Sequence, residues 1–122
     1  MDRAAAINEL ITFSRGLSGV TEDVKWGREL VFSVGDKMFC VFSEKQGELA
    51  RVSFKVPDER FLEYTDREQF IPAPYLARAK WVTIINFAGL DPAEIRDAIK
   101  TSWQLVLSKL SKTRQRAILG DS

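Results

Sequence analysis

The segment Leu30–Phe42, with the sequence LVFSVGDKMFCVF, limits the possible folds of this chain more than any other stretch. Apolar, β-branched and aromatic residues, which are typical of strands, lie on both sides of Gly35-Asp36. A two-residue loop that contains Gly is typical of a tight hairpin, because Gly adopts positive φ without a steric penalty. We therefore predict a hairpin with these facing pairs: Val34 and Lys37, Phe32 and Phe39, and Leu30 and Val41.

Two more strands are predicted from the residues that follow the hairpin. Leu49–Val56 alternates between apolar and polar residues, so that Arg51 and Lys55 share its solvent-facing side. Trp81–Phe87 is rich in β-branched and aromatic residues and is predicted as a fourth strand. The polar segment Thr21–Glu29 and the proline-containing segment Phe70–Trp81 are predicted as irregular connections.

Helices are predicted at both ends of the chain. Asp2 is a suitable N-cap for a first helix, in which apolar residues recur at helical spacing as far as Leu17. The sequence Asp91-Pro92-Ala93-Glu94 is typical of a helix start and precedes a long amphipathic stretch. Shorter helices are predicted from Asp58, as the cap, to Tyr64 and over Ser111–Leu119.

These elements predict a two-layer α+β sandwich with a mainly antiparallel sheet. The N- and C-terminal helices each need an apolar partner, and one face of the sheet provides it. The second face of the sheet is then partly open. We expect residues 1–122 to form a single domain, because the chain has the length of one typical domain.

Composition restricts the classes of function. The 18 basic and 17 acidic side chains nearly balance, so there is no overall attraction to nucleic acid or to an anionic membrane. The chain has no His, the commonest general base and zinc ligand, and its single cysteine, Cys40, lies in an apolar strand. We expect no catalytic residues, no metal site and no cofactor, which favours a binding protein over an enzyme.

The expected location is the cytoplasm. A single thiol suits a reducing compartment, the N-terminus lacks the pattern of a signal peptide, and no apolar run is long enough to span a membrane. We therefore expect no membrane partner, and a protein that is a monomer or a weak homodimer.

Several motifs resemble the MmcQ/YjbR-like family. The resemblance runs from about Ile7 to Leu119 and includes TEDVKWGRELVFSVGDKMFCVF, RVSFKV and FIPAPYLARAKWVTI. Its most specific parts are Trp26-Gly27, Gly35-Asp36-Lys37-Met38-Phe39, Pro74-Tyr75-Leu76 and Lys80-Trp81, the last of which shortens the Lys-x-Trp spacing. The resemblance implies a CyaY-like, frataxin-type sandwich, in a family whose members are often described as DNA-binding proteins. Iron binding by an acidic ridge is not expected, because Asp2 and Glu9 are the acids of the first helix.

The first candidate site is a basic and aromatic surface that binds DNA. The cations would contact phosphates, and Trp26 and Trp81 would stack on bases. The candidate residues are Lys25, Trp26, Arg28, Arg51, Lys55, Arg78, Lys80 and Trp81. In the alternative interpretation, the two tryptophans pack at the edge of the core and the cations are ordinary solvated residues.

The second candidate site is an aromatic and proline-lined cleft that binds a small molecule or a protein. Its candidate residues are Trp26, Pro72, Pro74, Tyr75 and Trp81, with Tyr75 and Lys80 as the polar groups. In the alternative interpretation, the segment that contains Pro74 is a lid that completes the core.

A third cationic group lies near the C-terminus, at Lys109, Lys112, Arg114 and Arg116. These side chains either bind phosphate or complement the dipole of a helix C-terminus.

Overall fold

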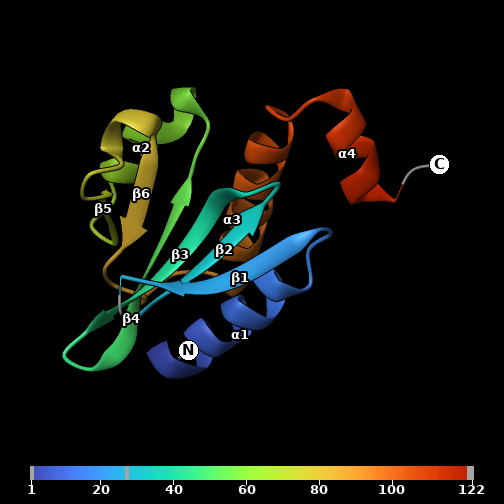
Figure 1. Ribbon diagram of the computed structural model, residues 1–122. Coiled ribbons are helices and arrows are strands. Elements are labelled where there is room, and N and C mark those ends of the chain that lie inside the picture. Colours follow the sequence, from blue (N-terminus) through green and yellow to red (C-terminus); the bar gives the residue numbers. More distant parts are fainter. Residues whose placement is uncertain (1, 27, 121–122) are drawn as a thin grey trace.

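The computed structural model describes residues 2–26 and 28–120; Gly27, part of one motif named above, lies outside the described residues. Figure 1 shows a sheet with its helices. The helices are α1 (Arg3–Arg15), η1 (Asp58–Arg60), α2 (Phe61–Thr65), η2 (Ala77–Ala79), α3 (Pro92–Leu107) and α4 (Lys112–Leu119). The strands are β1 (Val20–Lys25), β2 (Glu29–Val34), β3 (Lys37–Lys45), β4 (Glu48–Lys55), β5 (Phe70–Pro72) and β6 (Trp81–Ile84).

The six strands form one sheet in the order β1-β2-β3-β4-β6-β5, and every neighbouring pair is antiparallel. The predicted strands join in this sheet, and the α+β fold class is confirmed. The caps predicted for α1 and α3 are also confirmed: the Asp2 carboxylate accepts a hydrogen bond from Ala5 N, and the Asp91 carboxylate accepts one from Ala93 N.

The main core lies between the sheet and the two long helices, α1 and α3. Phe32, Phe42 and Phe54 of the sheet are fully buried against Ile7 of α1 and Ile99 of α3. Figure 1 shows both helices on the same side of the sheet. Among residues 2–26 and 28–120, the opposite face therefore carries no long helix.

The hairpin of β2 and β3 contains a β-bulge that the sequence analysis did not predict. Val34 pairs with Lys37 as predicted, but Phe32 pairs with Cys40 instead of Phe39, and Leu30 pairs with Phe42 instead of Val41. Phe39 is the extra residue of the bulge. The extra residue allows both Phe39 and Cys40 to be buried in the main core.

Other predictions about the elements were wrong in detail. The predicted connection over Thr21–Glu29 contains the edge strand β1, and the proline-containing segment contains β5. Strand β6 ends at Ile84, before Phe87. Asp58 does not cap the short helix, because no side chain forms a capping hydrogen bond at the start of η1.

Candidate functional site

The second face of the sheet carries a small apolar layer of its own. Val31 and Val41 face away from the long helices and are buried under Ala73, Trp81 and the partly buried Leu76. The segment between β5 and β6 covers them. Ala73 N donates a hydrogen bond of 3.0 Å to Trp81 O, and Trp81 N donates one of 3.3 Å to Leu76 O. The segment is thus fixed over one part of the sheet and leaves the neighbouring part uncovered.

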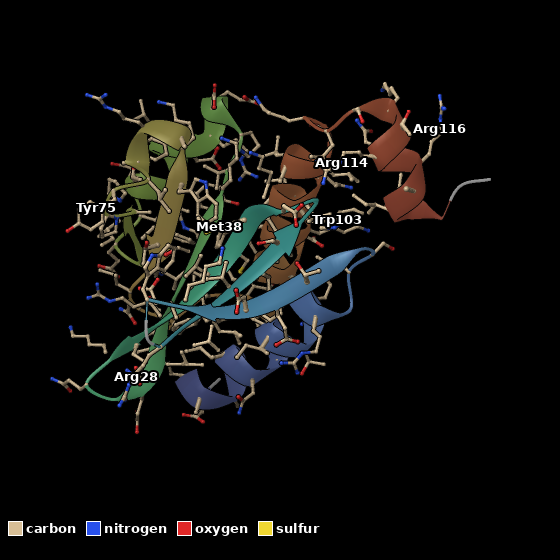
Figure 2. All side chains as sticks on the ribbon, viewed as in Figure 1. Arg28, Met38, Tyr75, Trp103, Arg114 and Arg116 are labelled. Atoms are coloured by element: carbon tan, nitrogen blue, oxygen red, sulfur yellow. The ribbon has the colours of Figure 1, made fainter. Side chains whose placement is uncertain are left out.

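A groove with a volume of about 530 Å³ borders this layer. The groove is lined by Trp26, Glu29, Met38, Val41, Ser43, Arg51, Ser53, Ala73, Pro74, Tyr75, Leu76 and Thr83. Figure 2 shows Met38 over the sheet and Tyr75 at the outer edge of the molecule. The floor comes from strands β2, β3, β4 and β6, and residues of two separate connections, among them Trp26 and Tyr75, border it.

Tyr75 occupies an unusual position in the turn Ala73–Leu76. Leu76 N donates a hydrogen bond of 3.1 Å to Ala73 O, Pro74 holds the second position, and Tyr75 has a φ of 66° at the third. These are the features of a type II turn, whose third position normally requires Gly. The Tyr75 side chain is fully exposed, so packing does not compensate for its left-handed backbone.

Trp26 has the same combination of properties. It follows β1 with a φ of 52°, and 69% of its surface is exposed. The other tryptophans are buried: Trp103 donates a hydrogen bond from Nε1 to Ser18 O, and Trp81 packs below the β5–β6 connection. Trp26 is thus the tryptophan whose ring is available to a ligand.

The polar groups of the groove floor lie on adjacent strands. The hydroxyl oxygens of Ser53 and Thr83 are 2.7 Å apart and share a hydrogen bond. Arg51 is the register partner of Ser43. Within residues 2–26 and 28–120, the Arg51 guanidinium forms no ion pair and no hydrogen bond with another side chain.

The structure brings together part of the predicted cleft. Trp26, Pro74 and Tyr75 line the groove, whereas Pro72 and Trp81 do not. Pro72 pairs with Val82, whose side chain belongs to the main core, so Pro72 lies on the other side of the sheet. The alternative interpretation, in which this segment is a lid that completes the core, applies to Ala73 and Leu76, because both pack on the sheet.

Sequence reasoning missed several groove residues, among them Met38, Ser53 and Thr83. Alternation along Leu49–Val56 placed Ser53 on the same side as Arg51, which is a signal for that residue. Met38 and Thr83 gave no comparable signal, because their place depends on the bulge and on the pairing of β6.

The predicted nucleic-acid residues are spread over the molecule. Trp26 and Arg51 line the groove, but the Arg28 guanidinium binds Glu44 at 3.3 Å, and Lys80 lies over the Phe61 ring at 5.1 Å. Lys55 Nζ donates a hydrogen bond to Ala79 O.

The other three predicted nucleic-acid residues are Lys25, Arg78 and Trp81. Lys25 ends β1 opposite Glu29, and Arg78 is exposed in η2. Trp81 is only 5% exposed, because the β5–β6 connection covers its ring. The prediction that this ring stacks on bases was therefore wrong.

Two of the four C-terminal cations lie far from the groove. Arg114 and Arg116 belong to α4, at the opposite end of the molecule from Tyr75 (Figure 2). Arg114 Nη2 lies 3.6 Å from Asp36 Oδ2 in the hairpin turn. These cations and the groove therefore do not form one continuous binding surface.

Cys40, the single thiol of the chain, is buried in the main core. Burial raises the pKa of the Cys40 thiol well above its usual value of 9.0, which disfavours the reactive thiolate. Among residues 2–26 and 28–120, no group of three His, Cys, Asp or Glu side chains is placed to hold a metal ion. None of the described helices combines the length and apolarity needed to cross a membrane.

Comparison with known proteins identifies several relatives. A model of the YjbR family matches residues 15–105. The Escherichia coli O157:H7 protein YbdF is 27% identical over 89 residues, which span 72% of this chain and 72% of YbdF.

Solved structures share the fold. The crystal structure of Deinococcus radiodurans protein DR2400, described as a DUF419 domain, is similar with a TM-score of 0.80 and 26% identity, over 95% of this chain and 90% of that one. A Pseudomonas syringae protein has the same fold with a TM-score of 0.66 and 19% identity, over 87% of this chain and 99% of that one.

Proposed function

The chain belongs to the YjbR family, and we propose that this member is a binding protein whose groove holds a small, flat and largely apolar molecule between Trp26 and Tyr75. The groove combines apolar walls with few polar groups, as small-molecule sites do. Its volume of about 530 Å³ lies within the range of about 300–1,000 Å³ that is usual for such sites. A small molecule suits this size better than a protein segment, which would need a longer surface.

The backbone conformation of Tyr75 is the observation that carries this proposal. A left-handed conformation costs a residue other than Gly about 1–2 kcal/mol. Tyr75 has a φ of 66°, and its exposed ring gains no packing energy in return. A large side chain that costs stability and contributes nothing to the core is best explained by a role in binding.

Fluorescence titration with N-phenylnaphthylamine, a neutral probe made of a naphthyl and a phenyl group, tests the proposal. We expect saturable binding with one site per chain. Tyr75→Gly and Trp26→Ala should each weaken binding about tenfold, because each removes one aromatic wall. Leu62→Ala is the matched control, since Leu62 is 77% exposed on α2 and does not line the groove. Binding that is unaffected by both groove substitutions would rule the proposal out.

DNA is a second candidate ligand, and the presence of Trp26 and Arg51 in one groove favours it. An exposed ring and a cation in one groove can contact a base and a phosphate. We expect weak binding that decreases with salt and with Arg51→Gln. Fluorescence anisotropy of a labelled oligonucleotide at low salt measures it, and a flat titration would remove this candidate.

A further inference from the structure

We propose that Arg51 binds an anionic group on the molecule held in the groove. The ligand class is then an aromatic compound with one negatively charged group. This inference rests on the proposed function, since it assigns the chemistry of the same site.

The position of Arg51 on the sheet provides the donors. Arg51 and Ser43 are directly opposite each other on β4 and β3, and both line the groove. Side chains in such a pair have Cβ atoms about 4.5–5.5 Å apart. A guanidinium with its fork of N–H donors and a hydroxyl can therefore bind the same anion. Among the described residues, neither side chain has a hydrogen-bonding partner.

The nearby carboxylates are engaged elsewhere. Glu44 on β3 accepts a hydrogen bond of 3.3 Å from Arg28, and Glu48 on β4 accepts one of 3.1 Å from Arg3. Arg51 also borders a second hollow, which Lys45 and Arg3 line together with Glu48. The charge of Arg51 thus remains available to a ligand.

Glu29 determines which end of the groove an anion occupies. Leu30 on β2 pairs with Phe42 on β3, so the preceding residue, Glu29, lies opposite Ser43. Ser43 in turn pairs with Arg51 on β4, so β3 lies between Glu29 and Arg51. Two strand spacings separate Glu29 from Arg51, a distance of about 10 Å. The carboxylate repels an anion at the β2 side. The anionic group therefore lies at the β4 side, and the ring extends toward the aromatic walls.

A pair of matched probes tests the inference. Anilinonaphthalene sulfonate has the same rings as N-phenylnaphthylamine and adds one negative charge. We expect the sulfonate to bind about tenfold more tightly than the neutral probe, which corresponds to one charge-assisted hydrogen-bonding group. Arg51→Gln should weaken binding of the sulfonate more than binding of the neutral probe, so that the difference between the two affinities disappears. Arg51→Lys should restore part of it, because the charge is kept without the planar fork.

The control variant is Arg116→Gln, which removes the same charge from α4, outside the groove. It should leave both affinities unchanged. Glu29→Gln should tighten sulfonate binding about two- to threefold, because it removes a like charge. Melting temperatures of all variants verify that they are folded.

The outcomes separate the two proposals. Equal affinity for both probes, with no effect of Arg51→Gln, would overturn the inference and leave the groove as a site for neutral molecules. No binding of either probe would overturn both. Displacement of the sulfonate by an oligothymidylate would contradict the assignment to a small molecule. The ligand would then be a nucleic acid, whose base provides the ring and whose phosphate provides the anionic group.

Discussion

Tyr75 and Trp26 adopt backbone conformations that the packing of the protein does not require. Each has a positive φ, and each exposes a large ring beside the groove. Trp103, by contrast, is 7% exposed and its indole N–H is bonded to Ser18 O. The comparison separates a tryptophan that stabilises the core from one that is available for binding.

The strain at Tyr75 leads to a prediction about stability. We expect Tyr75→Gly either to leave the free energy of unfolding unchanged or to raise it by up to about 1 kcal/mol. Gly removes the cost of positive φ, and part of this gain is offset by the greater entropy of the unfolded chain. Urea denaturation at neutral pH measures the effect. A loss of more than about 1 kcal/mol would mean that the ring supports the fold after all.

At the scale of elements, Ser102 connects α3 to the sheet. Its buried hydroxyl donates a hydrogen bond of 2.6 Å to Phe39 O and accepts one of 3.0 Å from Lys55 N. Phe39 is the bulge residue, so the bulge directs a carbonyl toward the helix. Ser102 thereby holds β3 and β4 in place beneath the groove.

Removal of this hydroxyl should be costly. We expect Ser102→Ala to lower the free energy of unfolding by about 1.5–3 kcal/mol, because two backbone groups lose their partner. Ser108→Ala is the control, since Ser108 is the exposed C-cap of α3 and its hydroxyl donates to Leu105 O at the end of that helix. Chemical denaturation of both variants gives the comparison. Equal stability of the two would show that water replaces the Ser102 hydroxyl at little cost.

A second link between elements depends on pH. Arg67 donates hydrogen bonds of 2.8 and 3.1 Å to Glu94 in the first turn of α3, and these bonds lower the pKa of Glu94 below its usual value of 4.5. A lowered pKa means that the stabilisation is present above pH 4.5 and is lost as the pH falls through the folded-state pKa.

Glu94→Gln tests this link. Because the pair is partly exposed, we expect the variant to be less stable by at most about 1 kcal/mol at pH 7. The difference from the wild type should shrink as the pH falls from 4.5 and vanish below the lowered pKa of Glu94. Thermal unfolding at several pH values measures it. A difference that stays constant down to pH 3 would assign the effect to packing instead of charge.

Most elements could be predicted from the sequence, and the exceptions have physical reasons. The hairpin, β4, β6, α1 and α3 have strong periodicity or caps, because one side of each is buried. β1 is an edge strand whose residues are largely exposed, so it lacks a hydrophobic pattern. β5 has three residues and contains Pro72. The bulge depends on contacts between β3 and α3, which no local pattern reveals.

At the scale of the whole molecule, the two faces of the sheet have different roles. One face holds the main core against α1 and α3, and the other holds the groove and the short layer under the β5–β6 connection. The sheet is therefore stabilised from one side, and the groove that we propose as the ligand site lies on the other.

The candidate site was only partly predictable for the same reason. Trp26, Pro74 and Tyr75 could be identified as groove residues because aromatic and proline residues in connections are conspicuous. The burial of Trp81 was one of two interpretations, and the sequence could not decide between them, because burial depends on how the segment from Ala73 to Lys80 folds back over the sheet. Local sequence does not determine such a contact.

A titration followed by amide correlation spectroscopy is the most direct test of ligand binding on the open face of the sheet. With anilinonaphthalene sulfonate as the probe, we expect the largest shifts at the Trp26 indole and at Arg51, Tyr75 and Thr83, with α1 and α4 unchanged. Shifts that are confined to α4 or to the helical side, with these groove residues unmoved, would contradict the account.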